Sequence, residues 1–233
     1  MANGPTELSP TTLLGGLPRE LSDKLLLGKP IILRKGKTLF ERGDAGDGCY
    51  WLRQGVVAVS AMSAMGDQRT LAILGPGALI GELAMIDGLP RSASVAAIRD
   101  CTLTFVGRTA FKAMLLSHPE IYMNIVALLS ARLRHSDEEM IASSFLSVQA
   151  RVARALLQFA RHIGEETEKG RVAIRHKVTQ RDLAAMAGVA RESVSRTISA
   201  WKKANIIEGS PRTRYLVNIG RLEREATAME PAG

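Results

Sequence analysis

The placement of glycine is the strongest constraint on the fold of this chain. Ten of its 21 glycines lie between Gly36 and Gly88, where they separate short segments rich in β-branched and aromatic residues, such as residues 49–52 and 70–74. Frequent turn residues between short strands are typical of a β-sandwich or a β-barrel. Residues 30–106 are therefore predicted to form a small β-sandwich or β-barrel, called the barrel below.

The composition of the next segment indicates helix. From residue 107 to residue 163 the chain is rich in Ala, Leu, Met, Arg and Glu, which are the strong helix formers. Pro119 suits the first turn of a long helix, because the N–H that proline lacks has no partner at that position. A long helix is therefore expected to follow the barrel.

This long helix carries a heptad pattern. One set of residues repeats at alternating spacings of four and three: Tyr122, Val126, Leu129, Leu133, Ser136, Met140 and Ser143. The pattern predicts that the helix pairs with a second copy of itself, and the alternative is that it packs against its own barrel. Ser136 and Ser143 favour pairing between copies, because a dry intramolecular core would leave their hydroxyls unsatisfied.

The excess of positive charge lies almost entirely in the last part of the chain. The formal net charge is +8. Residues 1–146 hold 15 basic and 14 acidic residues, and residues 147–233 hold 16 and 9. Within residues 171–214, ten basic residues are opposed by three acidic ones. This balance is typical of a nucleic-acid-binding module, although a solvated basic surface would give the same count.

Residues 179–204 have the pattern of a helix-turn-helix unit. Thr179 lies three positions before an acidic residue, as in a capping box, and predicts a helix over residues 180–186. Gly188 tolerates the left-handed turn that follows, and a second helix is predicted over residues 191–204. The small position and the buried position of such a unit are occupied by Ala184 and Val194.

The flanking segments complete this module. A helix is predicted over residues 147–161, followed by a polar loop over residues 165–170. Residues 206–208 and 215–219 are expected to form the two strands of a wing hairpin. The tail, residues 220–233, is predicted to contain a short helix that frays before its end.

The start of the second helix is the predicted reading surface for DNA. In a helix-turn-helix unit the first residues of this helix reach the edges of the bases. Here they are Arg191, Glu192, Ser195 and Arg196. Arginine can donate two hydrogen bonds to guanine O6 and N7, and glutamate can accept one from cytosine N4. The alternative is an ordinary helical hairpin with solvated charges.

A second motif lies within the predicted barrel, where residues 81–93 read GELAMIDGLPRSA. Backbone N–H groups of a short helical turn at Gly81 and Glu82 can face an anion. Arg91 and Ser92 supply a fixed cation and a hydroxyl donor for a phosphate, and a carboxylate can accept from a sugar hydroxyl. The alternative is that Glu82 and Arg91 only form a salt bridge in a barrel that binds nothing.

With these motifs, residues 29–219 resemble the CRP/FNR family of bacterial transcription regulators. The segments that carry the resemblance are KGKTLFERGDAG, GALIGELAMIDGLPRSA, FLSVQARVARALL and ARESVSRTI. The resemblance implies an α+β fold in three parts: an amino-terminal cyclic-nucleotide-binding β-barrel (jelly roll) over residues 1–117, a dimerisation helix over residues 118–146, and a carboxy-terminal winged helix-turn-helix DNA-binding domain over residues 147–233.

The resemblance also implies a nucleotide site. In the family the GEL…RSA segment binds a cyclic nucleotide, so Glu82 is expected to hold the ribose 2′-hydroxyl, and Arg91 and Ser92 the cyclic phosphate. The expected site also includes Gly81, Leu83 and Ala93, of which Gly81 and Ala93 offer backbone groups.

For the DNA-binding domain the resemblance implies a target sequence. Arg191, Glu192 and Arg196 stand where the family reads a TGTGA-type half-site. The expected phosphate contacts are Thr179, Arg181, Ser193 and Arg212.

Two residues of the long helix are relevant to whether the cyclic nucleotide carries adenine or guanine. In the family a Thr-Ser pair meets adenine, the second residue coming from the partner subunit, and the matching pair here is Ser136 and Asp137. An ionised carboxylate accepts hydrogen bonds and cannot donate them, so Asp137 suits guanine N1–H and N2–H₂ at least as well as adenine N6–H₂. Arg-Ser in place of Arg-Thr at residues 91–92 favours adenine. The expected effector is cyclic AMP, with cyclic GMP as the alternative.

The sequence lacks the residue patterns that several other classes of function require. Cys49 and Cys101 form no CxxC pair and the four histidines form no pair with metal-ligand spacing, so no metal, iron–sulfur or haem centre is expected. No histidine lies in the barrel region, which argues against a metal-dependent cupin enzyme. No segment suggests a membrane span or a leader, so the chain is expected to be cytoplasmic.

Taken with the resemblance, these features imply a homodimeric, cyclic-nucleotide-responsive transcription regulator with double-stranded DNA and RNA polymerase as partners. One alternative is a ligand-independent DNA-binding protein of the same family. The other is a cyclic-nucleotide-regulated enzyme, which no catalytic constellation in the sequence supports.

Overall fold

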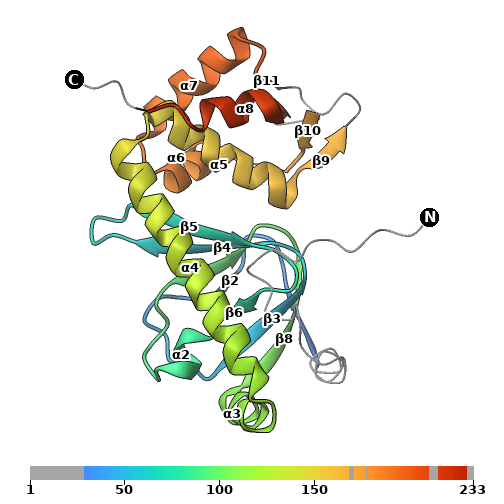
Figure 1. Ribbon diagram of the computed structural model, residues 1–233. Helices are drawn as coiled ribbons and strands as arrows, with labels where there is room; N and C mark the ends of the chain where they lie inside the picture. The colour runs from blue at the N-terminus through green and yellow to red at the C-terminus, as the bar shows by residue number, and fades with distance from the viewer. Residues whose placement is uncertain (1–28, 168–170, 177, 210–214, 230–233) are drawn as a thin grey trace. The chain divides into compact units, whose positions relative to one another are not determined.

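The computed structural model describes residues 29–167, 171–176, 178–209 and 215–229 (Figure 1). The chain divides into two compact units. The first combines the described residues up to Val59 with Leu74–Ser136, and the second combines Ser60–Ile73 with the described residues from Asp137 onward. The mixture of helices and strands is the expected α+β class.

The strand-rich region consists of two four-stranded sheets. The first sheet has the order β1-β8-β3-β6, with β1 (Pro30–Leu33), β3 (Gly48–Gln54), β6 (Leu79–Ile80) and β8 (Cys101–Gly107). The second has the order β2-β7-β4-β5, with β2 (Thr38–Phe40), β4 (Val57–Met62), β5 (Gln68–Leu74) and β7 (Ser94–Ala97). The jelly-roll expectation is confirmed, but the sheets are not closed into a barrel, because each ladder pairs strands of its own sheet.

Helices cover one face of the first sheet. They are α2 (Leu83–Ile86), α3 (Arg108–Ser117) and the first half of α4 (Glu120–Phe145). Ile121, Ile125 and Leu128 of α4 follow helical spacing and are buried in one cluster with Cys49 and Phe111. The long helix thus begins at Glu120, one residue after Pro119, which was expected in its first turn, and one face of it packs on its own sheet.

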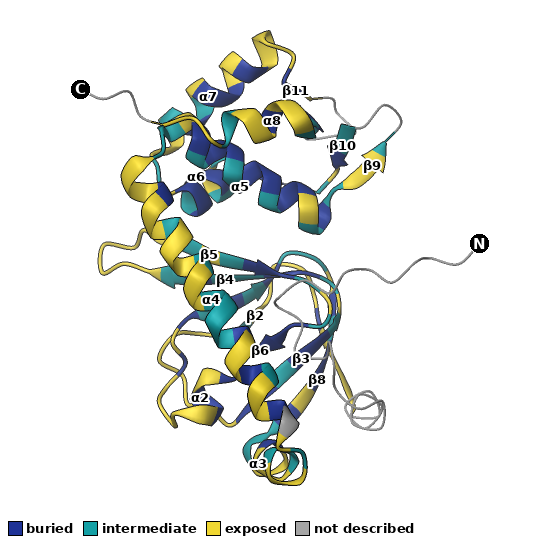
Figure 2. Ribbon diagram, in the orientation of Figure 1, coloured by how far each residue is buried: buried dark blue, intermediate teal, exposed yellow. Residues whose placement is uncertain are grey.

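The heptad face of α4 is a different face. Tyr122, Val126, Leu133 and Met140 are exposed, and Leu129 is half-buried against the core cluster (Figure 2). Ser136 and Ser143 are exposed as well. The helix therefore packs on its own sheet and still presents an apolar stripe to solvent.

The carboxy-terminal elements form a winged helix-turn-helix. In chain order they are α5 (Val148–Ile163), β9 (Glu165–Thr167), β10 (Arg171–Ile174), α6 (Gln180–Ala187), α7 (Arg191–Lys203), β11 (Ile207–Glu208), β12 (Tyr215–Asn218) and α8 (Ile219–Glu225). The strands form one sheet in the order β11-β12-β10-β9. This confirms the two helices and the wing.

One local prediction is wrong. Residues 165–167, expected in a polar loop, form β9, which pairs with β10 in antiparallel register from Thr167 opposite Arg171. The strand was not predicted because its residues are polar. Polar residues are tolerated there because β9 lies at the edge of the sheet, where side chains remain half-exposed or exposed. The tail helix, expected within residues 220–233, is α8 and starts at Ile219, where the Asn218 side chain accepts a hydrogen bond from the Arg221 N–H.

Candidate functional site

The GEL…RSA segment begins with a glycine that the geometry requires. Gly81 has φ +78°, and a Cβ added there would lie 2.4 Å from Nη1 of Arg91. Because no other residue has both this backbone freedom and no side chain, Gly81 lets the backbone approach the guanidinium. Its carbonyl accepts a hydrogen bond from Arg91 Nη1 at 2.8 Å.

Arg91 is the centre of this segment, and it is only 4% exposed. Its Nη2 donates to the Gly48 carbonyl at 2.7 Å and lies 3.3 Å from Oδ1 of Asp47. The guanidinium carbon lies 4.3 Å from the centroid of the Phe40 ring, which is a cation–π contact. The side chain is thus held in one position by contacts from β2, β3 and the Gly81 turn.

Arg91 also retains unused hydrogen-bonding capacity. Its Nε is buried and has no hydrogen-bond partner among the described residues. A buried unsatisfied donor costs about 1–3 kcal/mol, more when it is charged. Asp47 gives little compensation, since its side chain is 73% exposed. A small anion that accepts from Nε would remove this cost, so the residues present fit a phosphate group.

The other residues predicted for this site differ in accessibility. Ser92 and Leu83 are exposed, whereas Ala93 is buried and Gly81 is half-buried. The Ser92 hydroxyl is therefore accessible to a ligand beside the buried arginine.

Glu82 is 1% exposed, and its carboxylate accepts a hydrogen bond from Arg132 of α4. Arg132 also donates to the Leu79 carbonyl at 2.9 Å. Glu82 and Arg91 thus have separate partners, which argues against the alternative in which they only neutralise each other. A sugar hydroxyl could still donate to Glu82, because a carboxylate has several lone pairs.

Arg132 is the site residue that the sequence reasoning missed. It precedes Ser136 by four positions, so the two lie on the same face of α4. That spacing was the available signal, but arginine on a helix is usually explained as solvated surface charge. Ser136 and Asp137 are exposed one turn further along α4.

Two buried thiols, Cys49 and Cys101, lie in the first sheet. Burial raises the pKa of Cys49 to about 12, and the nearby negative charge of Glu82 adds to the shift. Burial also raises the pKa of Cys101. Because the thiolate is the reactive form, neither residue suits catalysis or metal binding. Within the described ranges, no three His, Cys, Asp or Glu side chains are grouped as a metal site would require.

The helix-turn-helix has the predicted local chemistry. The Thr179 hydroxyl accepts a hydrogen bond from the Asp182 N–H at 3.1 Å, and Asp182 Oδ2 accepts from the Thr179 N–H at 2.7 Å. This reciprocal pair is the capping box at the start of α6. Gly188 ends α6 with φ +64°, and Val194 is fully buried, so α7 is fixed against α6.

The predicted reading residues are available on α7. Arg191, Glu192 and Arg196 are exposed, and Ser195 is half-buried. Among the expected phosphate contacts, Arg181 is exposed, Thr179 and Ser193 are half-buried, and Arg212 lies outside the described residues. Ser193 accepts a hydrogen bond from Arg196 Nη2 at 3.3 Å, which holds that arginine along the helix.

A jelly roll with a buried arginine at a glycine turn, joined to a winged helix-turn-helix, is typical of one class of protein: a DNA-binding regulator with a small-ligand domain. Sequence comparison agrees, because the cyclic nucleotide-binding domain family matches residues 30–118 and the Crp-like helix-turn-helix domain family matches residues 150–225. The chain belongs to the CRP/FNR family of transcription regulators.

Individual relatives cover nearly the whole chain. It is 36% identical over 213 residues to the cyclic AMP receptor protein of Thermus thermophilus, covering 91% of this chain and 94% of that one. It is 29% identical over 198 residues to the CRP-like cAMP-activated global transcriptional regulator of Mycobacterium tuberculosis, covering 85% and 88%. A solved transcriptional regulator of the CRP/FNR family, also from Thermus thermophilus, matches with a TM-score of 0.74 at 23% identity, covering 87% and 100%. These relatives are transcription regulators, not enzymes.

No helix in the described part of the chain has the length and apolarity of a membrane span.

Proposed function

We propose that this chain is a homodimeric transcription regulator that binds palindromic TGTGA-type DNA sites in response to a cyclic nucleotide, with cyclic AMP as the effector. The observation that carries the proposal is the buried Arg91, whose Nε has no partner among the described residues. Two relatives that match most of the chain are named for cyclic AMP, which supports this effector.

The proposed nucleotide site is connected to α4 through Glu82 and Arg132. Arg91 Nε and the Ser92 hydroxyl donate to the phosphate, and Glu82 accepts from the ribose 2′-hydroxyl. Because Glu82 also holds Arg132 of α4, a change at Glu82 reaches the dimerisation helix directly. Ser136 of one protomer and Asp137 of its partner meet the base. Such coupling requires that the nucleotide favours one arrangement of the helices energetically.

The three parts of the proposed regulator follow the division at residues 1–117, 118–146 and 147–233. The exposed apolar stripe of α4 supports pairing of two copies, and paired copies present two helix-turn-helix units to half-sites about one DNA turn apart. RNA polymerase is a further proposed partner. The proposed location is the cytoplasm, where bacterial DNA is accessible.

Calorimetry with cyclic AMP and cyclic GMP, followed by DNA binding in the presence of each, tests this function. Cyclic AMP is expected to bind more tightly and to raise the affinity for a TGTGA-type palindrome. Equal DNA affinity without nucleotide and with either one would contradict the switch, and it would favour a ligand-independent regulator.

The variant Asp137→Ser tests the base contact. Asp137 accepts hydrogen bonds from either base and cannot donate when ionised, whereas serine can donate and accept. We expect the variant to bind cyclic AMP about as well as the parent and cyclic GMP about tenfold more weakly, since one charge-assisted hydrogen bond is worth about 1.5–3 kcal/mol. An unchanged ratio of the two calorimetric affinities would exclude Asp137 from the base contact. Glu138→Ser, an exposed neighbour, is the control.

The variant Arg191→Ala tests the reading of DNA. Removal of its two hydrogen bonds to one guanine is expected to cost about 1–3 kcal/mol on the specific site and to relax specificity at that base pair. Binding to duplexes carrying each substitution of that pair measures this. Arg181→Ala is the control, because an arginine that meets only phosphate strengthens binding to all duplexes equally. A uniform weakening for Arg191→Ala would contradict its role as a base reader.

A further inference from the structure

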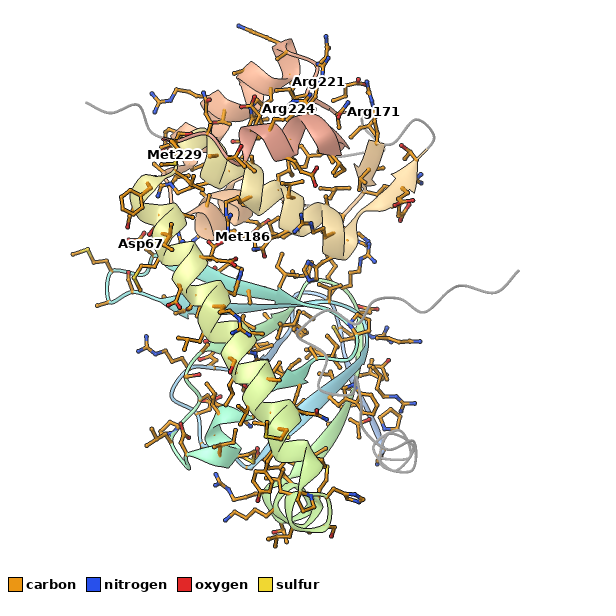
Figure 3. The ribbon with its side chains drawn as sticks, viewed as in Figure 1. Asp67, Arg171, Met186, Arg221, Arg224 and Met229 are labelled. Carbon is orange, nitrogen blue, oxygen red and sulfur yellow. The ribbon has the colours of Figure 1, made fainter. Side chains whose placement is uncertain are left out.

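The junction between α4 and α5 is held by the end of the chain. Helix α4 ends at Phe145 and α5 starts at Val148, so Leu146 and Ser147 form the connection. The Ser147 N–H donates to the Ala228 carbonyl at 3.1 Å, and Leu146 forms an antiparallel bridge with Met229. Figure 3 labels Met229 beside the end of α4. Residues 226–229, here named the strap, thus cross the junction.

Ser147 contacts both α5 and the strap. Its backbone is extended, with ψ 156°, and its hydroxyl accepts a hydrogen bond from the Ala150 N–H at 3.2 Å, which caps α5. The side chain therefore fixes the start of α5, while the backbone N–H is left for the strap. A further contact across the junction is the ion pair of Glu139 with Arg154 at 3.0 Å, which is partly exposed and so contributes little.

The same segment is attached to the recognition helix. The Trp201 Nε1 of α7 donates to Glu225 Oε2 at 3.3 Å, at the last residue of α8. Arg221 of α8 donates to the carbonyl of Ala204, which follows α7, at 3.1 Å. Leu222 is fully buried, which anchors α8 in the domain. One short stretch of chain therefore connects the end of α7 with the α4–α5 junction.

We propose that the strap positions the helix-turn-helix relative to the end of α4, so that the two units of a dimer are presented at a fixed separation to two DNA half-sites. The strap acts through Ser147 and through α8, and it contacts no base. The DNA readout rests on the function proposed above. The hydrogen-exchange measurement does not, because it follows the α4–α5 junction in the protein without DNA.

Two truncations of the full chain form the test. One ends at Thr227 and lacks the Ala228 carbonyl and Met229; the control ends at Met229 and keeps both. Hydrogen exchange in residues 145–150 is expected to be about fivefold faster in the chain ending at Thr227, since that chain cannot form the hydrogen bond and its bridge. Equal exchange in the two chains would overturn the strap.

DNA binding separates positioning from local stability. The chain ending at Thr227 is expected to bind a palindrome about fivefold more weakly than the control, because a looser junction lowers the effective concentration of the second unit. Its affinity for a single half-site should be unchanged. Faster exchange with an unchanged ratio of the two affinities would overturn the positioning role. If neither chain prefers the palindrome, the proposed DNA target fails and the positioning role falls with it, whereas the exchange comparison still decides whether the strap holds the junction.

Discussion

Replacement of Arg91 by alanine is expected to lower the affinity for cyclic AMP by a hundredfold or more. Arg91 is the buried arginine that we propose as the phosphate ligand, and its Nε has no hydrogen-bond partner among the described residues. The variant loses the charge-assisted hydrogen bond from Nε, worth about 1.5–3 kcal/mol, and also the positive charge of the guanidinium beside the phosphate, and together these losses account for this magnitude. Isothermal calorimetry measures the change directly.

The matched variant for this prediction is Arg91→Lys. Lysine keeps the charge but lacks the planar fork that donates to the Gly81 and Gly48 carbonyls, so an intermediate affinity is expected. Thermal unfolding of both variants monitors the effect on these structural hydrogen bonds. DNA affinity without nucleotide should stay at the parent level in both, because the reading residues belong to another unit. Parent-like nucleotide affinity in a folded Arg91→Ala protein would refute the assignment of the phosphate site.

The elements that the sequence predicted well are those with local signals. Thr179 and Asp182 form the capping box that their spacing indicated, and Gly188 adopts the left-handed conformation that its turn requires. The start of α4 after Pro119 has a similarly local cause. Each of these signals is complete within a few residues, so no distant partner had to be known.

The features that escaped prediction depend on distant pairing. Whether eight strands close into a barrel or stay in two sheets depends on which strands form hydrogen bonds, and the glycine pattern contains no such information. Strand β9 exists because β10 offers it an edge, although its own residues are polar. Arg132 reaches Glu82 across 50 positions of sequence. In each case tertiary contacts decided what the local sequence left open.

The second large effect is expected from a charge placed in the heptad face of α4. Leu133 is 64% exposed in the single chain and lies in the middle of the stripe of residues 122–143. In a dimer two leucines are buried together, each stabilising the pair by about 1.5–3 kcal/mol. Leu133→Glu replaces this gain with two carboxylates that face each other in a poorly solvated seam. The dissociation constant of the dimer is expected to rise by a hundredfold or more.

Sedimentation velocity at a few concentrations measures the shift from dimer to monomer. The affinity for a palindromic duplex should then fall strongly, whereas the affinity for a single half-site should not change. Leu116→Glu is the control, because Leu116 is 78% exposed on α3 and lies outside the heptad pattern. It should remain dimeric, which shows that a new surface charge alone does not dissociate the pair. A fully dimeric Leu133→Glu protein would exclude the α4 stripe as the dimer interface. Since Asp137 is proposed to act across that interface, it would also remove the proposed contact between this residue and the partner's nucleotide.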